Sequence, residues 1–295
     1  MKFLRSFLVL LSALQLIAGW GDLGHRTVAY LAQKYLNDEG THLVQNILRT
    51  NNNDDISDAA VWADRIKFRR PSTRPWHFID AQDNPPNSCS VTYESDCNSG
   101  CVVSAIKNMT ERVNDPSLDS VQRVEALRFL IHFIGDIHQP LHNEALARGG
   151  NDIIVKFDHR RENLHGIWDT DIPHKMNGIG HNLKHNNERA AAANWAAKLF
   201  QLNALRPLQA ECSNIQKPLE CSMLWARETN RLNCYFVLNN GIDWLKQNDL
   251  GGEYFDAAAL IVNEQILKAG IRLAAWLNAL GSATSPSTQP LFIQP

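Results

Sequence analysis

The chain has 295 residues, of which 44% are hydrophobic and 20% are charged, and its formal net charge is −2. This is an ordinary globular composition with enough apolar residues for a sizeable core, in one large domain or two small ones. The near-balanced charge contains no block of like sign, which excludes a basic arm that would grip nucleic acid by itself.

Residues 1–19 have the pattern of a secretory signal peptide. Lys2 and Arg5 form a basic start, residues 7–17 are an apolar run, and two small residues precede Trp20. Cleavage directly before Trp20 is predicted, and it leaves 27 basic against 31 acidic residues, a formal charge of −4. A membrane anchor is the alternative, but the run is short for a bilayer and no later segment is apolar enough to span one. We therefore expect a secreted, extracellular protein that is not held in a membrane.

Secretion permits disulfide bonds. Spacing alone cannot fix their pairing, because six cysteines allow 15 connectivities. No CxxC pair is present, which weighs against a zinc site made of thiolates. Asn108 begins an N-glycosylation sequon and is expected on the surface. The cysteines are Cys89, Cys97, Cys101, Cys212, Cys221 and Cys234.

The mature chain opens on a segment with helical spacing of its apolar residues, from Trp20 to Leu36. His25 lies near the start of this helix. A free α-amino group is a possible metal ligand because its pKa of about 7.7–8.0 lets it lose its proton easily. Trp20 and His25 together could therefore chelate a metal after signal cleavage.

A second predicted helix, with Ser57 as its expected cap, carries Asp64 and Lys67 three residues apart. These two residues form either a surface ion pair, which would add little stability, or a metal-binding carboxylate beside a phosphate-binding ammonium. Prolines then break the chain before a non-helical segment, in which His77 and Asp80 bracket an aromatic residue.

The third predicted helix runs from about Val121 to Ile137, with Asp119 or Ser117 as its cap, and it is apolar almost all round. Such a helix should be buried. It carries His132 and Asp136, whose i, i+4 spacing places both on one face. Buried imidazole and carboxylate groups need partners, and a metal would supply them.

The next segment repeats the same chemistry. His142 lies in the turn after that helix, residues 152–157 read as an extended piece, and residues 158–163 read as a charged turn. His165 and Asp169 then have the same i, i+4 spacing. Further helices are predicted at residues 190–202, 219–238 and 255–280, and the tail from Ser282 is predicted to be disordered. The fold class is thus all-α: a mainly helical single domain over residues 20–281, with one short β-hairpin and disulfide links.

The candidate ligands are too many for one zinc ion, which takes three or four, and suit three. They are Trp20, His25, Asp64, His77, His132, Asp136, His142, His165 and Asp169.

At this point the sequence resembles the fungal and plant zinc-dependent single-strand nucleases of the S-one and P-one type, with bacterial zinc phospholipase C as a more distant relative. The resemblance covers nearly all of the mature chain. It rests on the motifs WGDLGH, WAD, WHFIDA, HFIGDIHQPLH, RGGND and LHGIWD, which occur in the order typical of the family.

The resemblance implies roles for these residues. Asp64, His77 and His132 would hold one zinc ion. Trp20 and His25 would hold a second, with Asp136 bridging the two, and His142, His165 and Asp169 would hold the third. Lys67 and Asn151 match positions that contact the scissile phosphate, while Phe78 and Asp80 match a base-binding site. The implied disulfides are Cys89–Cys234 and Cys97–Cys101, and elimination leaves Cys212–Cys221.

The implied activity is that of an endonuclease on single-stranded DNA and RNA, giving 5′-phosphorylated products, with 3′-nucleotidase activity. Two zinc ions about 3.5–4 Å apart can hold a bridging hydroxide as the nucleophile. A phosphodiesterase of other specificity, such as a phospholipase C, and a non-catalytic zinc-binding protein are the alternatives, and a monomer is expected. One departure from the family lies in the 158–163 turn, where relatives can carry an aromatic residue and this chain has His159, Arg160 and Arg161.

Overall fold

The computed structural model describes residues 20–49, 55–180, 186–205 and 207–284. The predicted signal peptide, at residues 1–19, lies outside the described residues. The described chain is mainly helical with one two-stranded hairpin, which confirms the predicted fold class. The α-helices are α1 (Asp22–Gln33), α2 (Asp38–Arg49), α3 (Ile56–Ile66), α4 (Tyr93–Asp96), α5 (Val102–Val113), α6 (Ser120–Asp136), α7 (Leu164–Gly166), α8 (Ile172–Met176), α9 (Asn186–Leu205), α10 (Pro218–Leu232), α11 (Ile242–Gln247) and α12 (Glu253–Thr284).

Short helical segments of other types join these helices. The 3₁₀ segments η1 (Pro71–His77) and η2 (Pro140–Asn143) each contain a candidate metal ligand. The segments η3 (Ile167–Asp171) and η4 (Asn233–Val237) are π-helical, and η3 contains Asp169. Single π-helical turns are rare and occur frequently at functional sites.

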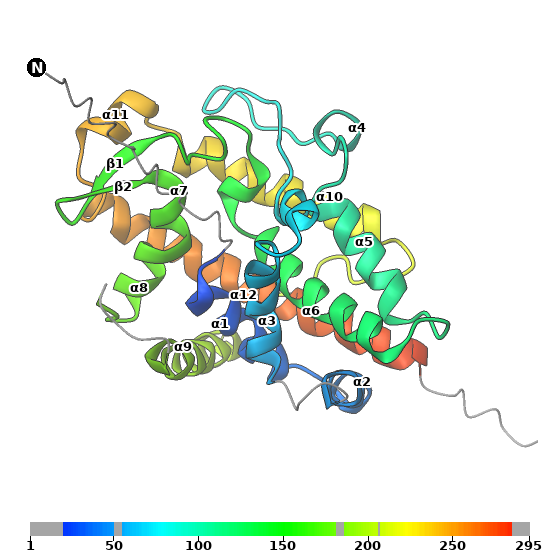
Figure 1. Ribbon diagram of the computed structural model, residues 1–295. Helices are drawn as coiled ribbons and strands as arrows, with labels where there is room; N and C mark the ends of the chain where they lie inside the picture. Colours follow the sequence, from blue (N-terminus) through cyan, green and yellow to red (C-terminus); the bar gives the residue numbers. More distant parts are fainter. Residues whose placement is uncertain (1–19, 50–54, 181–185, 206, 285–295) are drawn as a thin grey trace, which may run out of the picture.

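Helices α1, α6 and α12 lie at the centre of the molecule (Figure 1). Helix α1 packs against α3, α9 and α12, helix α6 packs against α3 and α5, and α12 extends from α8 to α2. The core between them contains four fully buried tryptophans, Trp20, Trp168, Trp225 and Trp276. The candidate ligands on α1 and α6 therefore lie inside the helical core rather than on its surface.

The hairpin pairs β1 (Ile154–Phe157) with β2 (Arg160–Asn163) in antiparallel register. The predicted charged turn at residues 158–163 is therefore too long. Only Asp158 and His159 form the turn, both with positive φ, and the following four residues are a strand. The charged side chains of Arg160 to Glu162 suggested a turn. They are compatible with a strand because one face of the hairpin is open to solvent.

Several helix boundaries differ from the predicted ones. Helix α3 is capped by Asp55, whose side chain accepts from the Ser57 backbone N–H, so the predicted cap Ser57 is wrong. Asp119 caps α6, with the Gln122 side chain bonded back to the cap. Helix α12 continues to Thr284, three residues into the segment predicted to be a disordered tail. The rest of that tail lies outside the described residues.

Three disulfides link the chain, Cys89–Cys234, Cys97–Cys101 and Cys212–Cys221. They are the same pairs that the resemblance and elimination gave. Cys89–Cys234 ties the loop after η1 to η4, across 145 positions of sequence. Within the described ranges, every helix is too short or too polar to cross a membrane.

Candidate active site

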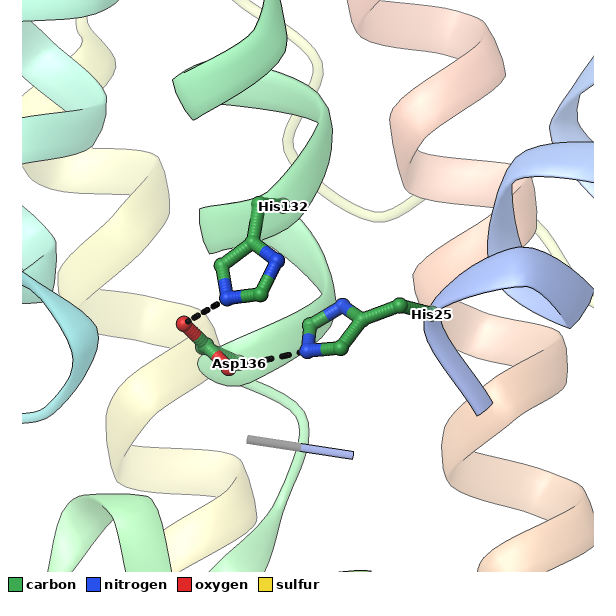
Figure 2. A group of neighbouring side chains, drawn as sticks. All are labelled: His25, His132 and Asp136. Carbon is green, nitrogen blue, oxygen red and sulfur yellow. Dashed lines mark ion pairs between the residues drawn. The ribbon is translucent and has the colours of Figure 1, made fainter. Parts of the chain in front are cut away.

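Helix α6 brings His132 and Asp136 against His25 of α1 at the centre of the fold. Figure 2 shows Asp136 between the two imidazoles. His25 Nε2 lies 3.3 Å from Asp136 Oδ1, and His132 Nε2 lies 3.1 Å from Asp136 Oδ2. Gly135 permits this approach, because a Cβ at that position would stand 2.7 Å from His25 Nδ1. All three ligand-type side chains are buried.

A first cluster forms where α3 and η1 meet α6. Asp64 Oδ1 lies 3.7 Å from His77 Nδ1 and 3.6 Å from His132 Nε2, and the two ring nitrogens lie 3.1 Å apart. Four ligands about 2.0–2.1 Å from a tetrahedral zinc ion would lie about 3.3–3.4 Å from one another. The observed separations bracket that value.

The two oxygens of Asp136 face different partners. Oδ2 lies 3.0 Å from His77 Nδ1 and 3.1 Å from His132 Nε2, on the side of the first cluster. Oδ1 lies 3.3 Å from His25 Nε2, on the side of α1. One carboxylate thus serves two adjacent groups of ligands, which is the arrangement that a bridging carboxylate requires.

The third cluster contains His142 of η2, His165 of α7 and Asp169 of η3. His165 Nε2 lies 3.1 Å from Asp169 Oδ2, and His142 Nε2 lies 3.9 Å from Asp169 Oδ1. The rings of the two histidines are stacked, with centroids 5.0 Å apart. The i, i+4 spacing of His165 and Asp169 therefore places the two side chains together, as predicted, although η3 is a π-helical segment.

The hydrogen bonds of the second ring nitrogen are further evidence that these residues could bind a metal. Nδ1 of His132, His142 and His165 lies 2.6–2.7 Å from the backbone carbonyl oxygen of Ala60, His77 and Gly149, respectively. A carbonyl fixes the proton on Nδ1 and leaves Nε2 as a lone-pair donor, as in most metal-binding histidines. Nε2 of His142 and of His165, with His25 Nε2 and Asp136 Oδ1, has no hydrogen-bond partner among the described residues.

Burial keeps much of this ligand set in the protonation state that binds metal. It lowers the pKa of His25 and His77, and it lowers the pKa of His142 to about 3, so these rings are neutral at neutral pH. Burial would raise the pKa of Asp136, but the neighbouring His132 and His142 hold it well below its ordinary value. Neutral imidazole and ionised carboxylate are the forms that zinc takes as ligands.

A fixed turn holds the third cluster in place. Ala147, Arg148, Gly149 and Gly150 all have positive φ, between 50° and 79°. This left-handed conformation costs roughly 1–2 kcal/mol for a residue with a side chain, so Ala147 and Arg148 are strained. The turn directs the Gly149 carbonyl at His165 Nδ1 and places Asn151 at the edge of the cavity described next.

A cavity of about 440 Å³ adjoins the third cluster through His165. Phe78, Asp80 and Asn151, all three named from the sequence, line it together. Burial raises the pKa of Asp80, and the Asp96 carboxylate adds to the shift. The other lining residues were not named from the sequence: Gln82, Leu141, Glu144, Ala145, Arg148 and Gly149.

Glu144 is the least expected member of this lining, because it is a carboxylic acid at only 2% exposure. Burial, with the neighbouring carboxylate of Asp83, raises the pKa of Glu144 to about 8. The Glu144 carboxyl is therefore mostly protonated at neutral pH, and the wall of the cavity carries less negative charge than the sequence implies. The position of Glu144 two residues after His142, the last residue of a metal-ligand motif, was the available signal for it.

Lys67, Trp20 and Asn108 complete the placement of the sequence-derived residues. Lys67 Nζ donates to Asp64 Oδ1 at 2.5 Å. Both side chains are nearly buried, so the two residues do form an ion pair, but it does not lie on the surface. Trp20 is fully buried, and the backbone N–H of the next residue donates to the Asp169 carbonyl at 2.8 Å. Asn108 is exposed on α5.

Comparison with known proteins agrees with this geometry. A family model described as S1/P1 Nuclease matches residues 20–282. Nuclease S1 of Aspergillus oryzae is 41% identical over 278 residues, covering 93% of this chain and 96% of its own. Nuclease P1 of Penicillium citrinum is 44% identical over 272 residues, covering 88% and 97%. Endonuclease 2 of Arabidopsis thaliana is 33% identical over 292 residues, covering 92% and 93%. The chain therefore belongs to the S1/P1 nuclease family.

Proposed function

We propose that this protein is a secreted, zinc-dependent endonuclease that hydrolyses the phosphodiester bonds of single-stranded DNA and RNA. Its products would carry 5′-phosphates, and it would also remove phosphate from 3′-nucleotides. The observation that carries the proposal is the presence of three buried His/Asp clusters, one of which borders, through His165, a cavity that contains Phe78 and Asp80. Three disulfides support a secreted protein, since such bonds persist in oxidising compartments.

Each zinc ion would have its own set of ligands. Asp64, His77 and His132 would hold the first, and His25 with the amine and carbonyl of Trp20 would hold the second. Asp136 would bridge these two through its separate oxygens. The third would be held by His142, His165 and Asp169. Bound zinc supplies a nucleophile from water near neutral pH and stabilises negative charge on phosphoryl oxygens.

The remaining residues would bind and orient the substrate. The Lys67 ammonium would stabilise charge on the scissile phosphate, and the Asn151 amide would donate to a phosphoryl oxygen. The Phe78 ring would stack on a nucleobase, while the Asp80 carboxylate would accept hydrogen bonds from the edge of that base. Both lie in the cavity next to the third cluster, so a bound base would place its phosphate toward the metals.

Selectivity for single strands follows from the stacking requirement. A base in a duplex must leave its stack to reach Phe78, which costs a few kcal/mol. Stacking on an aromatic ring returns about 1–3 kcal/mol per base. Attraction of a polyanion to a chain of charge −4 also needs the metals, because three zinc ions change the formal charge to +2.

A direct assay tests the proposal. The purified chain beginning at Trp20 is incubated with single-stranded DNA, RNA, the matching duplex and a 3′-mononucleotide, and the product ends are identified. Cleavage of both single strands to 5′-phosphate ends, with the duplex cut far more slowly, is expected. Failure to cleave any nucleic acid, with release of a phosphorylated headgroup from phospholipid vesicles, would instead indicate a phospholipase C.

The N-terminal ligand has its own test. A chain with one extra residue before Trp20 has no free amine at that position, and it should bind one zinc ion less tightly and lose most of its activity. The matched control adds the same residue after Thr284, at the end of α12. Unchanged zinc content and activity in the N-terminally extended chain would contradict the Trp20 assignment.

A further inference from the structure

The side-chain amide of Gln139 lies between two ligands of the third cluster. Gln139 is in the turn between α6 and η2 and is completely buried. Its Oε1 accepts from the Leu141 backbone N–H at 2.5 Å, and its Nε2 donates to Asp169 Oδ1 at 2.6 Å. The first contact fixes the residue before His142, and the second fixes Asp169 itself.

The orientation of this amide follows from its partners. Leu141 N–H is a donor and needs an acceptor, so the oxygen must face it. The NH₂ group then faces a carboxylate, which is an acceptor, so both arms are satisfied in one orientation and neither is in the flipped one. A hydrogen bond to an ionised group is among the stronger kinds.

Asp169 is oriented by this contact. Its Oδ1 is bonded to Gln139, and its Oδ2 lies 3.1 Å from His165 Nε2. The amide thus holds the oxygen that lies 3.9 Å from His142 Nε2, while the other oxygen faces His165. The backbone of Gln139 also contributes, because its carbonyl accepts from the His142 N–H at 3.1 Å.

We propose that Gln139 is a positioning residue for the third zinc ion, because one amide couples the turn that aims His142 to the carboxylate of Asp169. This inference rests on the proposed zinc-dependent function. Gln139 would touch neither metal nor substrate. Removal of such an outer partner of a metal ligand typically weakens metal binding about 10–100-fold.

The substitution Gln139→Glu distinguishes the two hydrogen bonds of the Gln139 amide, the one to Leu141 and the one to Asp169. The introduced carboxyl still accepts from Leu141 N–H, but it places a second acceptor against Asp169. A shared proton can restore that contact at low pH, so the variant is examined at pH 6 and at pH 8.5. The matched control is Gln122→Glu, on the exposed first turn of α6, where the side chain accepts from the Asp119 N–H in either form.

The measurement is zinc retention in a graded chelator competition, followed by metal analysis. A His142→Ala variant identifies which of the zinc ions belongs to the third cluster. We expect Gln139→Glu to release that ion at about 10–100-fold lower chelator concentration, with the larger deficit at pH 8.5. Gln139→Met, which removes both arms, should show the deficit at both pH values, and Gln122→Glu should match the parent.

A role confined to the turn would leave Gln139→Glu equal to the parent at both pH values, and that result would overturn the inference. If the parent holds no third zinc ion, the inference falls together with the three-zinc assignment. If the parent holds three zinc ions without cleaving nucleic acid, only the proposed function falls, since zinc retention is read without a substrate. Far-ultraviolet circular dichroism of each variant separates metal loss from unfolding.

Discussion

At the scale of single residues, the function depends on which atom of each side chain is available. In His132, His142 and His165, Nδ1 is committed to a backbone carbonyl, and this leaves Nε2 for a ligand. Asp136 has an oxygen on each side. The chemistry of the site is therefore set by hydrogen bonds that the sequence does not display.

A substitution of Phe78 tests whether a nucleobase stacks on this ring. Phe78→Ala removes the stacking ring from the cavity, and because stacking is worth about 1–3 kcal/mol per base, kcat/KM for single-stranded DNA should fall roughly 5–150-fold. Zinc content should not change. The control is Phe68→Ala, since Phe68 is 45% exposed and is not among the cavity residues. Equal rates for the two variants would show that no base stacks on Phe78.

At the scale of elements, a buried network fixes α12 against α10 and the end of α6. The Arg272 guanidinium is 2% exposed, and it donates to His138 Nε2 at 2.9 Å and to Glu228 Oε2 at 2.5 Å. Lys268 also donates to Glu228. This network anchors the turn directly after Asp136.

Removal of one partner from this network should be costly. Glu228→Ala removes the carboxylate that is hydrogen-bonded to the buried Arg272 and leaves only the exposed Glu211, at 3.7 Å, so we expect a loss of about 1.5–3 kcal/mol in the free energy of unfolding at pH 7. The control is Glu264→Ala, an exposed partner of Lys268, which should cost less than about 1 kcal/mol. Chemical denaturation measures both. Equal losses would show that Arg272 does not depend on Glu228.

The same substitution has a predictable pH dependence. Burial would raise the pKa of Glu228, but the hydrogen bonds from Lys268 and Arg272 outweigh it and lower the pKa below its ordinary value of 4.5. The unfolded chain therefore binds a proton at higher pH than the folded protein does. The stabilisation is fully present above pH 4.5 and is lost as the pH falls through the lower, folded value. The difference between Glu228→Ala and the parent should shrink on acidification below pH 4.5, and a constant difference would contradict the assignment.

The long-range disulfide should matter more than the local ones. Cys89–Cys234 closes a loop of 145 positions and Cys97–Cys101 a loop of four. Loop-closure entropy predicts a loss of about 5 kcal/mol when the first is removed and about 2 kcal/mol for the second. Paired Cys→Ser variants, compared by chemical denaturation, test this. Equal losses would mean that the loop after η1 stays in place without its link.

The elements show what the sequence could predict. Helix α6 is placed within one residue of its predicted bounds, because an apolar surface all round and a capping Asp119 mark it strongly. Helices α2 and α5 are not among the predicted elements, although Leu43, Val44 and Ile47 on α2 have helical spacing. The strand at residues 160–163 has the composition of a turn and is fixed by pairing with β1.

At the scale of the whole molecule, the ligand types were readable from the sequence and their grouping was not. His25 and His132 are 107 positions apart, yet their rings stack with centroids 3.7 Å apart, because α1 and α6 cross at Gly135. The grouping into separate zinc ions came from family resemblance. Gln139, Glu144 and the left-handed turn were given no role from the sequence, since each acts through tertiary contacts.

The charge of the whole molecule would give the proposed zinc ions a second role, in attracting the substrate as well as in the chemistry. The mature chain is expected to carry −4, and its substrate is a polyanion. Removal of metal should therefore weaken substrate attraction and remove the nucleophile at the same time. Metal binding should also stabilise the fold, because ions that bind only the folded state shift the folding equilibrium toward it.

One measurement tests the central claim most directly. The chain beginning at Trp20 is stripped with a strong chelator and dialysed, and cleavage of single-stranded DNA is followed as zinc is returned in known equivalents. The account predicts that the stripped protein is inactive, that activity returns with zinc, and that it reaches its plateau at three equivalents per chain. Full activity in protein shown by metal analysis to contain no zinc would contradict it.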